Sequence, residues 1–203
     1  MPYFPLFIDL TNRPCLIVGG GRVAYRKAEK LRPYGAKITL IAPEFCPELE
    51  EMADVDRLCR VFEDPDVRGM TLVISATDDA ELNHRISQLC QAESIPVNVV
   101  DDRENCTFLF PSLVQKGELS VGISTGGASP TAAVWLKEQI NALLPPNFDA
   151  ILVWLEGLRP RFKEEIQDES RRSALFSAAF RACLEQGRPL TAQELDSLME
   201  VAS

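Results

Sequence analysis

A glycine-rich turn near the N-terminus holds the first residues whose types and spacing could do chemistry. Gly19, Gly21 and Ala24 occupy the three small-residue positions of the pattern G-x-G-x-x-G/A, between an apolar run and a helical pattern. The first glycine allows a tight turn, the second lets a pyrophosphate approach backbone amides at the helix N-terminus, and the third position lets helix and strand pack closely. The pattern predicts a dinucleotide site; a glycine-rich turn without a ligand is the alternative.

The residues that follow the next apolar run, at 36–41, indicate whether NAD or NADP is bound. In such folds an acidic residue at the end of the second strand usually bonds the ribose. Here Ala42 is followed by Pro43 and Glu44, so either the Glu44 carboxylate or backbone groups of Pro43 would bond it. No arginine or lysine follows until Arg57, which leaves no nearby cation for a 2′-phosphate. The sequence therefore favours NAD over NADP as the cofactor.

Two later apolar runs end in polar residues, at 75–79 and 98–103. In an open parallel sheet, both groups would lie at the carboxyl edge, where ligands bind. Asp101 is placed there to take a proton while a hydride leaves the substrate, and a positioned general base contributes about 10²–10⁴-fold. A turn-forming role is the alternative for Asp101. Thr77 and Asp78 are candidates for cofactor contact, although Asp78 or the aspartate after it would equally serve as a helix cap.

A third glycine-rich segment, Ser124–Pro130, leads into another helix. Its amides and the positive end of the helix are suited to a substrate carboxylate. The candidate contacts are Ser124, Thr125 and Gly126. A plain connection between a strand and a helix is an equally good interpretation.

The elements that position these residues follow from the hydrophobic pattern. Continuous apolar runs, typical of strands buried on both faces, alternate with helical patterns. This alternation indicates a doubly wound α/β fold of Rossmann type with a parallel sheet. The expected strands are 14–18, 36–41, 71–76 and 97–100, and the expected helices are 23–34, closed by Gly35, and 80–92.

The pattern changes after Asp101, and we expect three parts: a Rossmann-type domain at 1–106, a small α+β segment at 107–145 and a helical C-terminal domain at 146–203. A serine N-cap followed by proline opens the helix of the second part. The expected elements are strands at 107–114 and 119–124 with a turn at Lys116–Gly117, a helix from Ser129–Pro130 to Pro145–Pro146, and a helical tail with a capping box at Thr191–Glu194.

Composition excludes several classes of protein. No apolar stretch approaches the roughly 18 residues of a membrane span, and Asp9 interrupts an N-terminal segment that has no basic region, unlike a signal peptide. We therefore expect a cytoplasmic protein that does not act at a membrane. The net charge of −9 argues against a nucleic-acid partner. Six scattered cysteines without a CxxC pair, and one histidine, His84, argue against a zinc site and a disulfide framework, so we expect no metal.

Taken together, these segments resemble the siroheme synthase N-terminal family, the precorrin-2 dehydrogenases, some of which are also sirohydrochlorin ferrochelatases. The likeness covers roughly the first 145 residues closely and the helical tail in character only. Six motifs in the family's order are far more specific than the glycine turn alone. They are Pro5–Ile8, Cys15–Ala28, Ala76–Asp79 with Asn83, Asn98–Asp101, Phe108–Pro111 and Ser124–Pro130.

The resemblance implies an enzyme of siroheme biosynthesis, an NAD-dependent oxidoreductase that converts precorrin-2 to sirohydrochlorin. It also implies an intertwined homodimer, in which the segment at 107–145 makes much of the contact. Arg22 and Val23 match the family's pyrophosphate-contacting pair, and Pro43 and Glu44 match its ribose-contacting pair.

The same resemblance assigns further roles. Asp101 matches the aspartate implicated in dehydrogenation and, in bifunctional members, in chelation. Thr125 stands where some members have serine, which puts any serine-specific regulation in doubt. Because the substrate carries many carboxylates, we expect cations in its cleft, with Arg103 as a candidate contact. Other candidates are Arg22, Arg26, Lys137, Arg159, Arg161 and Arg172, most of which would be solvated surface charges.

Two other functions remain open from the sequence. A bifunctional enzyme that also inserts ferrous iron is as compatible with the motifs as a dehydrogenase alone, since chelation needs a base and no fixed metal site. A module that senses NAD(H) for a partner protein is a remote alternative. We expect no attached methyltransferase domain, so that precorrin-2 would arrive from a separate enzyme.

Overall fold

The structure is a computed structural model that describes residues 3–201. The N-terminal segment compared above with a signal peptide begins with Met1 and Pro2, which lie outside the described residues. The chain divides between Phe110 and Pro111 into two compact units, which are described separately below. The division at 106 and 145 expected from the sequence stays a prediction. Within the described residues, no helix is both long and apolar enough to cross a bilayer.

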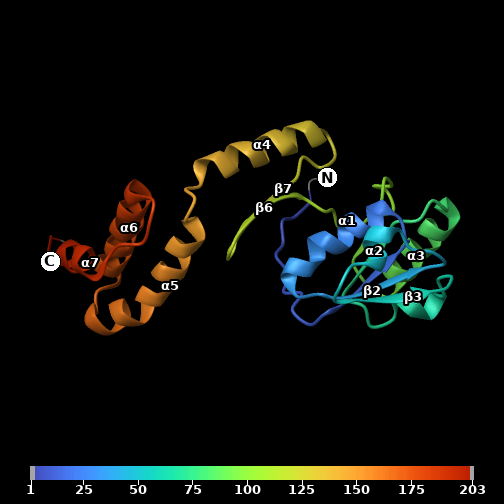
Figure 1. Ribbon diagram of the computed structural model, residues 1–203, viewed down its shortest axis with the longest axis horizontal. Helices are drawn as coiled ribbons and strands as arrows, with labels where there is room; N and C mark the ends of the chain where they lie inside the picture. Colours follow the sequence, from blue (N-terminus) through green and yellow to red (C-terminus); the bar gives the residue numbers. More distant parts are fainter. Residues whose placement is uncertain (1–2, 202–203) are drawn as a thin grey trace. The chain divides into compact units, whose positions relative to one another are not determined.

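The first unit is a five-stranded parallel sheet with the strand order β3-β2-β1-β4-β5, flanked by helices (Figure 1). This is the Rossmann-type arrangement that the alternating pattern predicted. The strands are β1 (Pro14–Val18), β2 (Lys37–Ala42), β3 (Val55–Cys59), β4 (Leu72–Ser75) and β5 (Val97–Val99). The helices are α1 (Arg22–Leu31), α2 (Pro47–Glu50) and α3 (Ala80–Ala92), with 3-10 turns η1 (Arg32–Tyr34) and η2 (Asp64–Val67).

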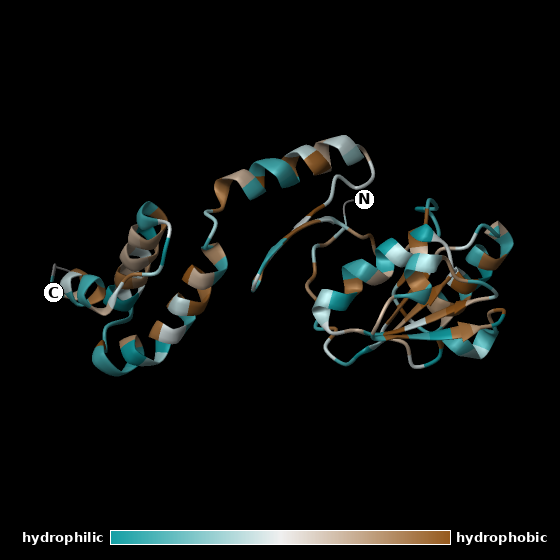
Figure 2. Ribbon diagram, in the orientation of Figure 1, coloured by the Kyte–Doolittle hydropathy of each residue, from teal (hydrophilic) through white to brown (hydrophobic). Residues whose placement is uncertain are grey.

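Both faces of this sheet are buried, which explains the continuous apolar runs of its inner strands (Figure 2). On one face, Ala24 and Ala28 of α1 and Leu49 of α2 pack on β1, β2 and β4. On the other face, Ile86 and Cys90 of α3 pack on alternate residues of the same sheet. The chain order reverses between β1 and β4, so this pair of strands is the topological switch point at which such folds bind ligands.

Most elements of the first unit lie where the pattern predicted them. β1 and α3 have the predicted bounds. The predicted helix at 23–34 is α1 followed by η1, and it ends at Gly35 in a left-handed conformation with φ 69°. β3 and α2 were not predicted. β3 is an edge strand in which every residue after Val55 is exposed, and Asp56 and Arg57 interrupt its apolar residues, so it lacks an apolar run.

The second unit begins with an antiparallel hairpin, β6 (Ser112–Lys116) and β7 (Leu119–Ile123), against which α4 (Pro130–Leu143) packs. Ser129 caps α4 by accepting a hydrogen bond from the amide of Ala132 at 3.1 Å, as predicted. The predicted strand at 107–114 was wrong in its first half. Thr107 and Phe108 instead donate backbone hydrogen bonds to the Val97 carbonyl, at 2.8 and 3.3 Å, and remain with the first unit.

The rest of the second unit is helical: α5 (Phe148–Glu165), α6 (Glu169–Gln186) and α7 (Ala192–Val201). Phe162, Leu175 and Leu195 bring one buried residue from each helix into a common core. The capping box before α7 is confirmed. The Thr191 amide donates to Glu194 Oε2 at 2.7 Å, and the Glu194 amide donates to Thr191 Oγ1 at 3.4 Å.

Candidate active site

The turn between β1 and α1 lies at the switch point, where its backbone meets the end of β4. Gly19 has φ 130°, a conformation that side chains rarely adopt, and its amide donates to the Ile41 carbonyl at 2.9 Å. A Cβ at Gly19 would lie 2.3 Å from the Ala76 carbonyl oxygen. The Ala76 amide in turn donates to the Val18 carbonyl at 2.8 Å. Only glycine therefore allows the end of β4 this close to the turn.

The same turn also meets the segment that follows β2. A Cβ at Gly20 would lie 1.8 Å from the Glu44 carbonyl oxygen, and the Cys46 amide donates to the Gly20 carbonyl at 2.7 Å. Pro43 and Glu44 are exposed beside this contact. The structure thus brings the predicted pyrophosphate-binding and ribose-binding residues together.

The N-terminus of α1 is open to a ligand. Gly21 is its N-cap residue, no side chain caps the helix, and the first turn contains no acidic residue. A Cβ at Gly21 would meet no atom within 4 Å, so the space above the turn is free. Arg22 and Val23 follow on the exposed side, and Arg22 Nε lies 3.6 Å from Glu48 Oε1. Open space, helical amides and the positive end of the helix fit the diphosphate of a dinucleotide.

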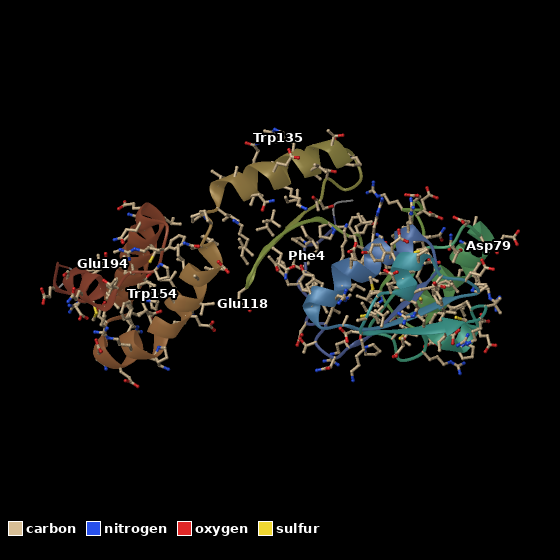
Figure 3. The ribbon with its side chains drawn as sticks, in the orientation of Figure 1. Phe4, Asp79, Glu118, Trp135, Trp154 and Glu194 are labelled. Carbon is tan, nitrogen blue, oxygen red and sulfur yellow. The ribbon has the colours of Figure 1, made fainter. Side chains whose placement is uncertain are left out.

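The end of β4 is held by a buried hydrogen-bond cluster. Asn83 Oδ1 accepts hydrogen bonds from Ser75 Oγ at 2.6 Å and from Thr77 Oγ1 at 2.7 Å, while Asn83 Nδ2 donates to the Thr77 carbonyl at 2.9 Å. Asp79, which Figure 3 labels, precedes α3. Its carboxylate caps this helix by accepting hydrogen bonds from the amides of Glu81 and Leu82, both at 3.0 Å. The cap is therefore Asp79 and not Asp78, although both side chains are exposed.

Asp101 lies just beyond β5, next to the end of β4, since the Val100 amide donates to the Ser75 carbonyl at 2.9 Å. It is exposed and has φ 58°, a left-handed conformation that residues other than glycine adopt rarely, and aspartate and asparagine more readily than most. The Asp102 carboxylate fixes the loop that follows by accepting from Asn105 Nδ2 at 2.6 Å, and this hydrogen bond is the main cause that lowers the pKa of Asp102.

Lys27 is a site residue that the sequence analysis missed. It projects from α1 toward β5, where its Nζ donates to Asn98 Oδ1 at 3.1 Å and lies 4.2 Å from the centroid of the Phe110 ring. Burial lowers the pKa of Lys27 to about 8, and the nearby Cys106 and Asp101 raise this pKa and so offset part of the effect. A polar Asn98 inside an apolar strand was a signal of a buried polar partner, but nothing in the sequence identified that partner.

The candidate substrate contacts are divided between the units. Arg103, in the first unit, is exposed, with its guanidinium 5.8 Å from the centroid of the Tyr3 ring. Ser124, Thr125 and Gly126 belong to the second unit, and their placement against Asp101 stays a prediction. There Thr125 Oγ1 accepts the Ser129 amide at 3.1 Å, and Ser124 Oγ accepts the Gly126 amide at 3.2 Å.

Two of the other predicted cations have partners within the helical tail. Arg161 forms ion pairs with Glu165 at 2.9 Å and with Asp196 at 3.0 Å. Arg172 donates to the Ile166 carbonyl at 2.7 Å. Their observed role is to hold helices together. Across residues 3–201, no three His, Cys, Asp or Glu side chains are grouped so that they could bind a metal ion.

Comparison with known proteins assigns the fold to a family. A family model described as "Putative NAD(P)-binding" matches residues 6–112, and a second model, "Sirohaem biosynthesis protein central", matches residues 116–143. The chain belongs to the NAD(P)-binding family of siroheme synthase N-terminal regions. It therefore has a domain for a nicotinamide dinucleotide.

Curated relatives support the same assignment. The chain is 42% identical to siroheme synthase of Thioalkalivibrio sulfidiphilus over 85% of its length, and 38% identical to siroheme synthase of Methylobacillus flagellatus over 91%. It spans 36% and 40% of the lengths of these two relatives. A solved structure of SirC, precorrin-2 dehydrogenase, has the same fold, with a TM-score of 0.74, 20% identity and 98% of each chain covered.

Two neighbouring glycines of the turn should respond differently to substitution. Gly21→Asp should fold normally, because its Cβ meets open space, and should lose NAD binding, because its carboxylate would face the diphosphate. Calorimetric titration with NAD measures the affinity. Gly20→Ala is the comparison variant, in which stability and not the charge near the diphosphate changes. Its Cβ would clash with the Glu44 carbonyl, so we expect its free energy of unfolding to fall by about 1–3 kcal/mol. Normal NAD binding by folded Gly21→Asp would contradict the assignment of the turn.

Proposed function

We propose that the chain is a precorrin-2 dehydrogenase, which oxidises precorrin-2 to sirohydrochlorin with NAD in siroheme biosynthesis. The observation that carries the proposal is the convergence at one sheet edge of an open dinucleotide turn and an exposed aspartate in a left-handed conformation. The siroheme synthase relatives and the shared fold with SirC, precorrin-2 dehydrogenase, support this substrate class.

The division of labour follows from the positions of these groups. Bound NAD would accept a hydride from the substrate. The residues Gly19–Val23 would hold the diphosphate, Pro43 and Glu44 the adenosine ribose, and Thr77 and Asp78 the nicotinamide end. The oxidation removes two electrons as a hydride and releases one proton, which Asp101 would take as the general base. Arg103, and Ser124–Gly126 from the second unit, would bind substrate carboxylates.

Two observations support NAD over NADP. The exposed Glu44 lies two residues after the end of β2, so its negative charge would repel a 2′-phosphate. Arg57, the first cation after β2, is engaged elsewhere: its Nη1 donates to the Leu49 carbonyl at 3.1 Å and to the Met52 carbonyl at 2.7 Å. No observation favours iron insertion or a sensing role, so neither is proposed.

We also propose a cytoplasmic homodimer. All six cysteines are free thiols, as is usual in a reducing compartment. On α4, Val134, Trp135 and Leu143 expose 50%, 57% and 81% of their surface, and Trp135 is seen on this helix in Figure 3. Apolar side chains gathered on one helix support a contact surface, here for the partner subunit.

An anaerobic assay tests the dehydrogenase. With precorrin-2 and NAD, NADH and sirohydrochlorin should appear in equal amounts, as followed by their absorbance. Asp101→Asn should lower turnover by about 10²–10⁴-fold and leave NAD binding intact, since asparagine tolerates a left-handed backbone. Glu104→Gln, an exposed carboxylate in the same loop, is the control that should keep full turnover. No NADH from a folded chain that binds NAD would refute the proposed reaction.

The cofactor preference has its own test. In titrations with each dinucleotide, the chain should bind NAD tighter than NADP by at least about tenfold, because of the charge on Glu44. Glu44→Gln should narrow this gap mainly by improving the affinity for NADP. Equal affinities in the unmodified chain would reject NAD specificity.

The oligomeric state tests the surface on α4. Analytical ultracentrifugation should show a dimer for the unmodified chain and a monomer for Trp135→Glu, since a charge would have to be desolvated in the contact. Glu138→Gln, at an exposed polar position of the same helix, should remain dimeric. A monomeric unmodified chain at micromolar concentration would contradict the proposal.

A further inference from the structure

Lys27 connects the two halves of the proposed site. It belongs to α1, the helix whose N-terminus would hold the diphosphate. Its ammonium reaches the strand that ends just before Asp101, because Nζ donates to Asn98 Oδ1 at 3.1 Å across 71 positions of the chain. α1 and β5 are not neighbours in sequence, and the side chains of Lys27 and Asn98 join them directly.

The partners of Lys27 are themselves fixed. Asn98 is buried and donates through Nδ2 to the Phe108 carbonyl at 3.1 Å and toward Cys106 Sγ at 3.4 Å. The Cys106 thiol lies 3.1 Å from both the amide nitrogen and the carbonyl oxygen of Val99. The Lys27 ammonium therefore joins a hydrogen-bond network that includes Val99 and Cys106, the residues on either side of the loop 100–105 that carries Asp101.

The second contact of the ammonium depends on its charge. Nζ lies 4.2 Å from the centroid of the Phe110 ring, within the range of a cation–π interaction. Phe110 packs with Phe108 at a centroid distance of 5.3 Å and joins the core beneath α1. Loss of the proton from Lys27 would remove the cation–π attraction and weaken the hydrogen bond to Asn98.

We propose that protonated Lys27 is a positioning residue for dehydrogenation, which fixes the cofactor-binding helix α1 against the strand and loop that carry Asp101. The inference rests on the proposed function. Hydride and proton transfer require the cofactor and the base to be aligned on one substrate, and small misplacements of such groups cost large factors in rate. Lys27 acts through Asn98 and Phe110 and is not itself a base in the reaction.

The groups around Lys27 determine the pH at which its hydrogen bond to Asn98 and its cation–π contact with Phe110 weaken. Burial lowers the pKa of Lys27 to about 8, and the neighbouring Lys30 on α1 adds to this effect, whereas Cys106 and Asp101 beyond β5 raise it. The ammonium is therefore present below pH 8 and lost as the pH rises through that value. The link should weaken in the range in which an exposed lysine is still fully charged.

The pH dependence of kcat separates this role from a purely structural one. In the unmodified chain, kcat should fall as the pH rises through about 8. In Lys27→Arg, the cation persists, so this alkaline loss should disappear up to about pH 10. In Lys27→Met, kcat should be lower than in the unmodified chain by about 10–100-fold below pH 8 and should show no step near 8, so that the two chains converge at alkaline pH, while the KM for NAD changes little. Lys30→Met should retain turnover and move the step to higher pH.

A direct titration of Lys27 provides a readout independent of turnover. With lysine labelled at Cε, the NMR resonance that disappears in Lys27→Arg reports the protonation of Lys27. Its pKa should fall in Asp101→Asn, because a stabilising carboxylate is removed, and rise in Lys30→Met, because a repelling ammonium is removed. Circular dichroism melting of each variant verifies that the chain is folded.

The outcomes are distinguishable. NADH formation with the same alkaline step in Lys27→Arg and Lys27→Met would overturn the role of Lys27 and leave the dehydrogenase intact. An ordinary lysine pKa that is insensitive to Asp101→Asn would also overturn it. Failure of the folded, NAD-bound chain to form NADH from precorrin-2 would instead overturn the proposed function.

Discussion

The backbone of the turn after β1 lies against two neighbouring backbones, and the rest of the site depends on this close approach. Gly19 faces the Ala76 carbonyl, and Gly20 faces the Glu44 carbonyl, at distances that leave no room for a Cβ. A side chain at either position would push apart the ends of β1, β2 and β4. These strand ends carry the candidate residues for the diphosphate, the ribose and the nicotinamide. Because Gly19 and Gly20 have no Cβ, the three groups of candidate residues can lie close together.

The chain has a net charge of −9, yet its proposed ligands are anions. The structure resolves this conflict locally, because backbone amides and the helix dipole of α1 supply positive potential without a basic surface. The first turn of α1 has no acidic residue, and the nearby Arg22 is balanced by Glu48. Just beyond β5, Asp101 has a left-handed backbone conformation, and the hydrogen bonds between Asp102 and Asn105 hold the loop that follows it.

Much of the first unit could be predicted from local patterns. β1 and α3 were predicted to the residue, because a strand buried on both faces is a continuous apolar run and a helix cap is a local signal. β3 was missed because an exposed edge strand has no such run. The strand predicted from Thr107 was wrong because the Thr107 amide donates to the carbonyl of Val97, ten positions earlier in β5, and so holds this segment to the first unit. Apolar composition alone could not distinguish that segment from β6.

By itself, the sequence determined the doubly wound fold, the glycine-rich turn after β1 and the position of the aspartate beyond β5, because spacing and residue type impose these features locally. Only the tertiary structure decided that Asp79 caps α3, that Arg161 pairs within the helical tail, and that Lys27 reaches Asn98. The environment of Lys27 is made by a helix, a strand and the Phe110 ring that meet only after folding. Burial and the charges that packing brings near determine the pKa of a side chain, and neither can be predicted from the residues next to it in the sequence.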